Sequence, residues 1–335
     1  VTGVQTCALP ICGSRVTIDT ELPTFSLTSI VSNNDTNTTT RASSGNTITA
    51  VLQASEALQG NPTVTIAGKN ATVTGLASNA YSASIGVTNA DLEGAADIVI
   101  SGFQDGTGNA GITKTINSTM VIDTTKPTFT DVTISSNNSL ATTRAKQGDT
   151  ITMSLVASEP LSANPTVTIA GKTASVSPNS LVTNAYTATY NVTNNEVQGV
   201  AAIIISGFTD AAGNAGDNVT ATTNSTSITI DTVNPIVSST RNVASDGTNL
   251  TTIAKLADDI YVKVSYNENV YHGTNSQIVI ESGSNSFTLT CETAGTNNFV
   301  IFKGTVNESN TSHIGMVNSG AFTITQISNV HDLTG

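Results

Sequence analysis

The stretch "VASEPLSANPTVTIAGK" (Val156–Lys172) decides the fold, because a near copy, "QASEALQGNPTVTIAGK" (Gln53–Lys69), lies about one domain length earlier in the chain. The sequences that follow each copy also recur in the same order: "NAYSASIGVTN" and "NAYTATYNVTN", then "IVISGF" and "IIISGF". A repeat of this length is the size of a folded domain, whereas solenoid repeats are shorter. The sequence therefore predicts tandem domains.

A shared opening segment marks the start of each repeat. It reads "VTIDTELPTF" (Val16–Phe25), "MVIDTTKPTF" (Met120–Phe129) and "ITIDTVNPIV" (Ile228–Val237), and its aspartates are spaced by 104 and 108 residues. The third copy is the most divergent, but "SYNENV" and "ISNVHDLTG" can still be aligned with "QASEAL" and "ISGFTDAAG". We predict three domains, at residues 16–122, 123–230 and 231–335, the last truncated at its C-terminus.

Residues 1–15 are not expected to belong to the folded domains. "VTGVQTCALPI" (Val1–Ile11) matches the translation of a common sequencing-library adapter, so residues 1–15 are expected to be an adapter-derived, disordered segment. Cys7 and Cys12 are accordingly not interpreted as a metal site or disulfide. Cys291 remains, and a lone Cys in an alternating strand is predicted to be a small buried apolar residue. We expect the chain to be a fragment whose secretion signal and anchor lie outside it.

Hydrophobic residues alternate with polar ones in every copy, which is the period of a β-strand with one wet face. Each copy contains about seven such runs, separated by Gly, Asn, Asp or Pro, and helical patterns are missing. This predicts an all-β fold of tandem, immunoglobulin-like antiparallel β-sandwiches. The predicted inward-facing sets are Ile48, Ala50, Leu52 and Ala54; Ile151, Met153, Leu155 and Ala157; and Ile260, Val262, Val264 and Tyr266.

Charge and hydropathy exclude several functions. The net charge is −12, with only 12 basic residues among 335, which disfavours nucleic acid and favours cations as electrostatic partners. No apolar run approaches the roughly 18 residues that a membrane helix needs, so no membrane span is expected. The three histidines are predicted to be isolated surface residues, and no G-x-S-x-G nucleophile elbow is present. The sequence therefore predicts no enzyme.

Acidic residues recur at three places in every copy, although only 11% of the residues are charged. One lies in the linker, one after the second strand and one in a glycine-bearing hairpin such as "GFTDAAGN". In immunoglobulin topology these three places meet at one end of the sandwich. The predicted metal ligands are Asp19, Glu56 and Asp105 with Asn109; Asp123, Glu159 and Asp210 with Asn214; and Asp231, Glu268 and Asp332.

Three converging carboxylates need a neutralising partner, because they repel one another by roughly 3–4 kcal/mol per pair at an effective dielectric constant near 20. Raised pKa values are one solution. An all-oxygen set on loops is also what Ca²⁺ selects, whereas zinc prefers His or Cys. The alternative is that Asp and Asn simply form Asx turns in a tight hairpin. We favour calcium because the turn alone does not explain the recurrence at all three places.

Three motifs carry a resemblance to a known family: the linker "IDTTKP" (Ile122–Pro127), "ASEPL" (Ala157–Leu161) and the hairpin "GFTDAAGNAGD" (Gly207–Asp217). With them the chain resembles tandem bacterial Ig-like domains of cell-surface proteins and large adhesins, over nearly its whole length past about residue 15. The resemblance implies calcium at domain junctions and an extracellular location at the bacterial cell surface.

The function expected from these features is that of a structural spacer or stalk in a secreted or surface-anchored adhesin-like protein, stiffened by Ca²⁺ where neighbouring Ig-like domains of the same chain meet. One alternative is a third domain that binds a glycan or a host-surface ligand, because Tyr261, Tyr266 and Tyr271 cluster there, although Tyr266 belongs to the core register and the other two are expected to pack on strand faces. Another is that the domains are accessory modules of an extracellular hydrolase.

Overall fold

The computed structural model describes residues 18–243, 259–282, 285–305 and 323–333. The adapter-like stretch, Cys7, Cys12 and His313 lie outside the described residues. The described part contains strands and turns, and no helix in it is long and apolar enough to cross a membrane. It folds into two compact units. The first contains the described residues up to Thr128 together with Glu159–Ala163 and Phe208–Asp217, and the second contains the remaining described residues. The predicted boundaries of three domains remain predictions.

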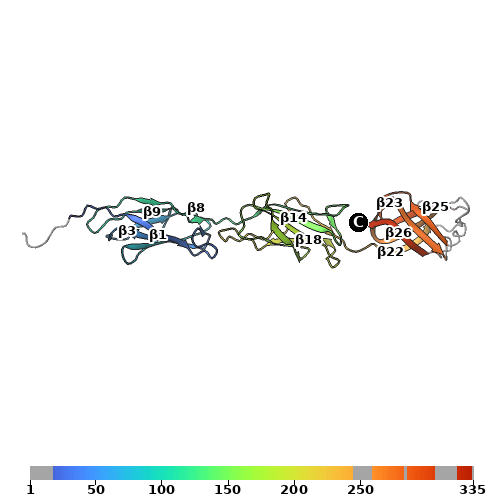
Figure 1. The fold of residues 1–335 in the computed structure, drawn as a ribbon, viewed down its shortest axis with the longest axis horizontal. Coiled ribbons are helices and arrows are strands. Elements are labelled where there is room, and N and C mark those ends of the chain that lie inside the picture. Colours follow the sequence, from blue (N-terminus) through green and yellow to red (C-terminus); the bar gives the residue numbers. More distant parts are fainter. Residues whose placement is uncertain (1–17, 244–258, 283–284, 306–322, 334–335) are drawn as a thin grey trace, which may run out of the picture. The chain divides into compact units, whose positions relative to one another are not determined.

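The first sandwich is built from two four-stranded sheets and one small sheet, coloured blue to cyan in Figure 1. One antiparallel sheet has the order β1 (Phe25–Ser32), β3 (Thr47–Ala54), β7 (Ala80–Gly86), β6 (Thr72–Gly75). The other has the order β10 (Lys114–Ile116), β9 (Ile98–Ser101), β4 (Thr63–Ile66), β5 (Lys69–Asn70). The small sheet joins β2 (Arg41–Ala42), β11 (Val121–Ile122) and β8 (Gly94–Ala95), with β2 and β11 parallel.

Alternation along β3 produces the core of the first sandwich. The predicted inward set on this strand is at most 2% exposed, which confirms the period-2 reading. Aromatic residues close the core beside the hairpin: Phe25 packs edge-to-face on Phe103 with ring centroids 4.9 Å apart. Gly111 lies directly over the Phe103 ring, because a Cβ built on it would approach a ring carbon to 1.9 Å. This contact fixes the hairpin to the core.

The second sandwich repeats this plan, coloured green to yellow in Figure 1. Its main sheet has the order β12 (Phe129–Ser136), β14 (Thr150–Ala157), β18 (Ala185–Asn191), β17 (Ser175–Pro178). Two smaller sheets join β16 (Lys172–Thr173), β15 (Thr166–Ile169) and β20 (Ile203–Ser206), and β13 (Arg144–Ala145), β21 (Thr229–Ile230) and β19 (Gly199–Val200). The predicted inward set of β14 is at most 4% exposed. The repeated sequence therefore gives a repeated fold.

The third sandwich, orange to red in Figure 1, is organised around one long strand. Its strands are β22 (Val237–Val243), β23 (Asp259–Ser282), β24 (Asn285–Cys291), β25 (Gly295–Thr305) and β26 (Thr323–Asp332). The first part of β23 pairs with β22 and β25, and its last part pairs with β24 and β26. The predicted inward set that ends at Tyr266 is at most 6% exposed. Strand β23 thus pairs with all four other strands of this sheet.

The prediction for His272 is wrong: this histidine is buried, with 4% of its surface exposed. It continues the inward alternation of β23 through Tyr266 and Val270, and that register was the available signal. Its Nδ1 lies 3.4 Å from Sγ of Cys291, which is buried as predicted. His331 is exposed, also as predicted.

A tight turn in the first sandwich contains an alanine in the left-handed region. Ala67 (φ 51°) and Gly68 (φ 75°) connect β4 to β5 as a two-residue hairpin loop, and this region costs a β-carbon-bearing residue roughly 1–2 kcal/mol. Asn tolerates it better, so Ala67→Asn is expected to raise the free energy of unfolding by about 0.5–1 kcal/mol. Urea unfolding measures this. Ala90→Asn, at an exposed position without positive φ, is the control and should leave stability unchanged.

The hydroxyl of Tyr266 is buried without a hydrogen-bond partner, and burial raises the pKa of this phenol to about 12. An unpaired buried polar group costs about 1–3 kcal/mol. Tyr266→Phe is therefore expected to stabilise the third sandwich by about 1 kcal/mol. Thermal unfolding checks this, with Tyr271→Phe as a control because Tyr271 is 46% exposed. A destabilised Tyr266→Phe protein would mean that the hydroxyl is paired.

Candidate metal centres

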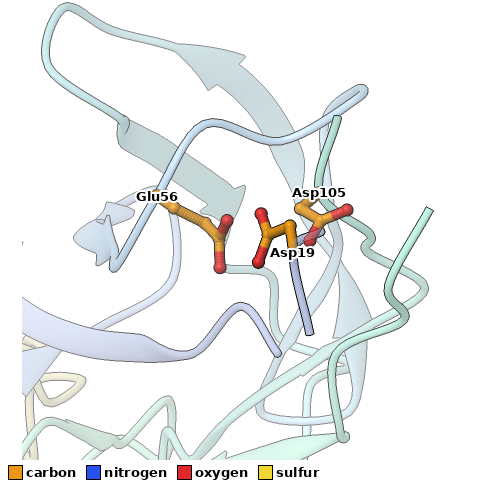
Figure 2. A group of neighbouring side chains, drawn as sticks. All are labelled: Asp19, Glu56 and Asp105. Atoms are coloured by element: carbon orange, nitrogen blue, oxygen red, sulfur yellow. The ribbon is translucent and has the colours of Figure 1, made fainter. Parts of the chain in front are cut away.

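Three carboxylates of the first sandwich converge, as Figure 2 shows. Asp19 comes from the segment before β1, Glu56 from the bend after β3 and Asp105 from the hairpin after β9. One oxygen atom of each lies within 4.8 Å of the others. Asp105 is buried, and Asp19 and Glu56 are half-buried. We call this group the first carboxylate centre; its assembly agrees with the topological argument from the sequence.

The hairpin positions Asp105 through hydrogen bonds. Its Oδ1 accepts the backbone N–H groups of Thr107 (2.8 Å) and Asn109 (2.9 Å), and its Oδ2 accepts from Nδ2 of Asn109 (2.7 Å). Burial alone would raise the pKa of Asp105, but these hydrogen bonds outweigh it and lower the pKa to about 2. Asp105 therefore forms the Asx turn and is also one of the three converging carboxylates.

Asn109 presents its amide nitrogen to the centre. Besides Oδ2 of Asp105, Nδ2 donates to the backbone oxygen of Asp19 at 3.1 Å. The sequence suggested that this asparagine adds an amide or main-chain oxygen to the ligands. In the structure its side-chain NH₂ group connects the hairpin to the segment that carries Asp19, so the side chain positions two carboxylates relative to each other.

The second carboxylate centre consists of Asp123, Glu159 and Asp210, all within the first compact unit. Their ligand oxygens again lie within 4.8 Å of one another. The hydrogen bonds of the hairpin are repeated: Oδ1 of Asp210 accepts from the N–H groups of Ala212 (2.8 Å) and Asn214 (2.9 Å). Nδ2 of Asn214 donates to Oδ2 of Asp210 at 2.8 Å. The same sequence motif has thus produced the same local geometry twice.

Asp123 is held by its backbone on both sides. It directly follows β11, and its N–H donates to the carbonyl of Ala42, the last residue of β2, at 3.0 Å. Its own carbonyl accepts from Nδ2 of Asn214 at 2.9 Å. Nearby, Nδ2 of the buried Asn34 donates to the carbonyl of Ala212 at 2.7 Å. The hairpin that carries Asp210 is therefore attached to the first sandwich and its linker at more than one point.

Both centres carry an excess of negative charge. Burial, followed by the charges of Asp105 and Asp19, raises the pKa of Glu56. Burial and the charge of Asp210 also raise the pKa values of Asp123 and Glu159. Such shifts mean that the carboxylates disfavour each other's ionised forms. Each centre is consequently a set of oxygens that would gain from a bound cation.

Sequence reasoning missed two residues at the second centre. Nη1 of Arg41 lies 3.7 Å from Oδ2 of Asp123. Oε1 of Glu93 accepts hydrogen bonds from N–H and Oγ1 of Thr124 (3.0 and 3.1 Å) and from Oγ1 of Thr125 (2.6 Å). Glu93 does not recur as an acid, because its counterpart in the second copy is Gln198, so the repeat carries no signal for it.

The third set, Asp231, Glu268 and Asp332, is less tightly gathered. Burial, then the charges of Asp231 and Asp332, raise the pKa of Glu268, so the three groups sense one another. Oε1 of Glu268 is buried without a hydrogen-bond partner. Within the described residues, however, only the first two centres bring three ligand atoms within 4.8 Å. Of the tyrosines named for a glycan surface, Tyr266 lies in the core and does not contribute to one, whereas Tyr271 is exposed.

The raised pKa values predict an unusual pH dependence in the absence of metal. A carboxyl whose folded pKa lies above its ordinary value of 4.5 contributes stability at low pH and loses it as the pH rises through the folded pKa. With a chelator present, the first unit should therefore become less stable as the pH rises from about 4.5 to 7. Asp105, with its pKa lowered to about 2, acts in the opposite direction at lower pH only. Calorimetry at several pH values should show that the free energy of unfolding changes less steeply with pH in Glu159→Gln than in the wild type. In Glu281→Gln it should change as steeply as in the wild type.

Comparison with known proteins finds structural likeness only. No protein-family model matches the chain, and no curated protein matches it. It is similar to a solved structure described as "Structural insight into host cell surface retention of a 1.5-MDa bacterial ice-binding adhesin", with 18% identity over 85% of this chain and 88% of that one and a TM-score of 0.42. A second similar structure, described as "Ca2+-stabilized adhesin helps an Antarctic bacterium reach out and bind ice", is 19% identical over 83% of this chain and 66% of that one, with a TM-score of 0.39. A marsupial T cell receptor is 10% identical over 84% of this chain and 93% of that one, with a TM-score of 0.33. Likeness at this level carries no argument about function.

Proposed function

We propose that this chain is a structural spacer from a secreted or surface-anchored bacterial adhesin-like protein, in which calcium at the linkers stiffens tandem Ig-like sandwiches. The observation that carries the proposal is the occurrence of two carboxylate centres at equivalent places, each combining a linker Asp, a loop Glu and a hairpin Asp within 4.8 Å. Two catalytic sites with the same residues in successive sandwiches would be hard to rationalise, whereas a repeated structural ion site follows from the repeat.

The donor set fits calcium. All three side chains offer oxygen, and Ca²⁺ takes six to eight oxygens at about 2.3–2.6 Å, which places ligand oxygens up to about 5 Å apart. Carboxylates on a linker and two loops can adjust to its tolerant geometry, whereas Mg²⁺ demands a near-octahedral shell. Asp123, Glu159 and Asp210 would hold the ion at the second centre, and Asp19, Glu56 and Asp105 at the first. The ion would supply positive charge that the carboxylates lack.

Calcium bound in this way would restrict the linker. Asp123 is part of the connector itself, while Asp210 lies on a hairpin and Glu159 on a loop. A shared ion would tie these three segments together. Pro127, four residues after Asp123, limits the backbone of the same connector by fixing its φ angle. The proposed result is a connector with little freedom to bend, as a spacer requires.

Hydrogen exchange of the intact chain with and without calcium tests the proposal. Peptides that cover the hairpins 103–111 and 208–217 should exchange more slowly with Ca²⁺ than with a chelator, because bound ligand stabilises the state that binds it. Mg²⁺ at the same concentration should protect them less. Equal exchange in calcium and chelator at both hairpins would refute the proposal.

A further inference from the structure

Arg41 lies at the second carboxylate centre but comes from the first sandwich. It occupies β2, which pairs in parallel with β11, the strand that leads into Asp123. Because the N–H of Asp123 donates to the carbonyl of Ala42, the backbone places Arg41 beside the linker aspartate. The guanidinium Nη1 then lies 3.7 Å from Oδ2 of Asp123.

The two centres differ in their surroundings although their ligands are the same. At the first centre, the charged groups that act on Glu56 are all acidic: Asp105, Asp19 and Glu21. At the second centre, Arg41 opposes the acidic groups that act on Asp123 and Glu159. One arginine cannot neutralise three carboxylates, but it reduces their mutual repulsion. The second centre therefore has a cation of its own when no metal is bound.

We propose that Arg41 is the resident counter-cation of the second carboxylate centre, which stabilises the linker and hairpin without metal and is displaced when a divalent cation binds. The inference rests on the proposed function for its second half only. A divalent ion among the three carboxylates repels a guanidinium placed beside Asp123, so the two cations compete. Arg41 thus makes the second centre less dependent on metal and lowers its affinity for metal.

The properties of the side chain suit this exchange. Arginine remains protonated at all relevant pH values, so its charge is constant. The Arg41 side chain is 36% exposed, and the partner Asp123 side chain is 16% exposed. A guanidinium in this position can turn toward water without leaving a buried charge behind. Displacement by a metal therefore breaks only a partly exposed ion pair.

Hydrogen exchange of the intact chain provides a site-specific test. In Arg41→Gln, the peptide 208–217 should lose protection in chelator. The free Ca²⁺ concentration that gives half-maximal protection of this peptide should fall about 3- to 10-fold. Peptide 103–111, at the first centre, should behave as in the wild type in both respects and also reports that the sandwich is folded. Arg41→Lys, which keeps the charge, should lie between wild type and Arg41→Gln.

Lys126→Gln is the matched control. Lys126 lies on the same linker and pairs with Asp217 at 3.0 Å, but both side chains are more than half exposed and neither belongs to the centre. Its removal deletes one positive charge and should change neither measurement. If Arg41→Gln behaves like Lys126→Gln, the counter-cation role is wrong.

The two proposals fail in different ways. If Arg41→Gln loses protection in chelator but binds calcium no more tightly than the wild type, Arg41 is a structural ion pair and the competition is wrong while the calcium proposal stands. If neither hairpin of the wild-type chain responds to calcium, the proposed function and the displacement both fall. The loss of protection in chelator would then still decide whether Arg41 is a counter-cation.

Discussion

Gly111→Ala and Gly216→Ala are each expected to destabilise their sandwich by about 3 kcal/mol or more, beyond the usual cost of overpacking a core. A Cβ at either position would lie 1.9 Å from a ring carbon of Phe103 or Phe208. Phe103 cannot move away easily, because it is 4% exposed and packs edge-to-face on Phe25. Urea unfolding followed by circular dichroism measures the loss.

Gly106→Ala provides the matched control. No atom lies within 4 Å of the position that its Cβ would occupy, its φ is not in the left-handed region, and the second copy has Ala211 at the equivalent place. It should change stability by less than about 0.5 kcal/mol. The smaller, ring-free side chain in Gly111→Ala/Phe103→Leu should recover part of the loss, because the clashing ring carbons are removed. If Gly111→Ala were as stable as Gly106→Ala, the hairpin would not be fixed to the core by this contact.

Asp105→Asn and Asp210→Asn are each expected to abolish calcium-linked protection of their own hairpin and to leave the other hairpin responsive. An ion that binds only the folded site contributes roughly 2.7 kcal/mol at a free concentration of 100 times its Kd, and the neutral side chain removes one of three charged ligands. The expected result is the loss of about this amount at the substituted centre, measured from the exchange rates of peptides 103–111 and 208–217 with and without calcium.

Asp217→Asn controls for the change in net charge. Its carboxylate is 86% exposed and lies next to the hairpin without joining the second centre, so both hairpins should keep their full response to calcium. If Asp105→Asn and Asp210→Asn kept it too, the hairpin aspartates would serve only the turn, as the competing interpretation of the sequence holds. The same pair of variants therefore separates the two explanations of the motif.

Period and repetition explain why the fold could be predicted. The alternation that ends at Ala54, Ala157 and Tyr266 fixes which face of each strand is buried, because a slip of one residue would expose the whole set. The long strand β23 could not be predicted, since where a strand bends depends on the partners that pair with each of its halves. His272 shows the cost of judging a residue by type: its place in the alternation outweighs its polarity.

The carboxylates of the candidate site could be predicted because they recur in each copy of the repeat. Linker, loop and hairpin acids recur in register, and the topology places them together, which led to Asp123, Glu159 and Asp210. Arg41 also recurs, as Arg144, but its contact with Asp123 and the amide orientation of Asn214 follow from backbone pairing and hydrogen bonds that the repeat alone does not reveal. Contacts of this kind, which change the charge and position of the ligands, can be identified only from the structure.

The parallel pairing of β2 with β11 has a mechanical consequence. Strand β11 leads straight into the linker, so tension applied from the linker reaches it before any other strand of the first sandwich. Because bonds between strands lie across the direction of pull, tension along β11 shears the rungs to Arg41 and Ala42 together instead of unzipping them one after another. Resistance to extension from this side of the first sandwich would therefore begin at these two residues.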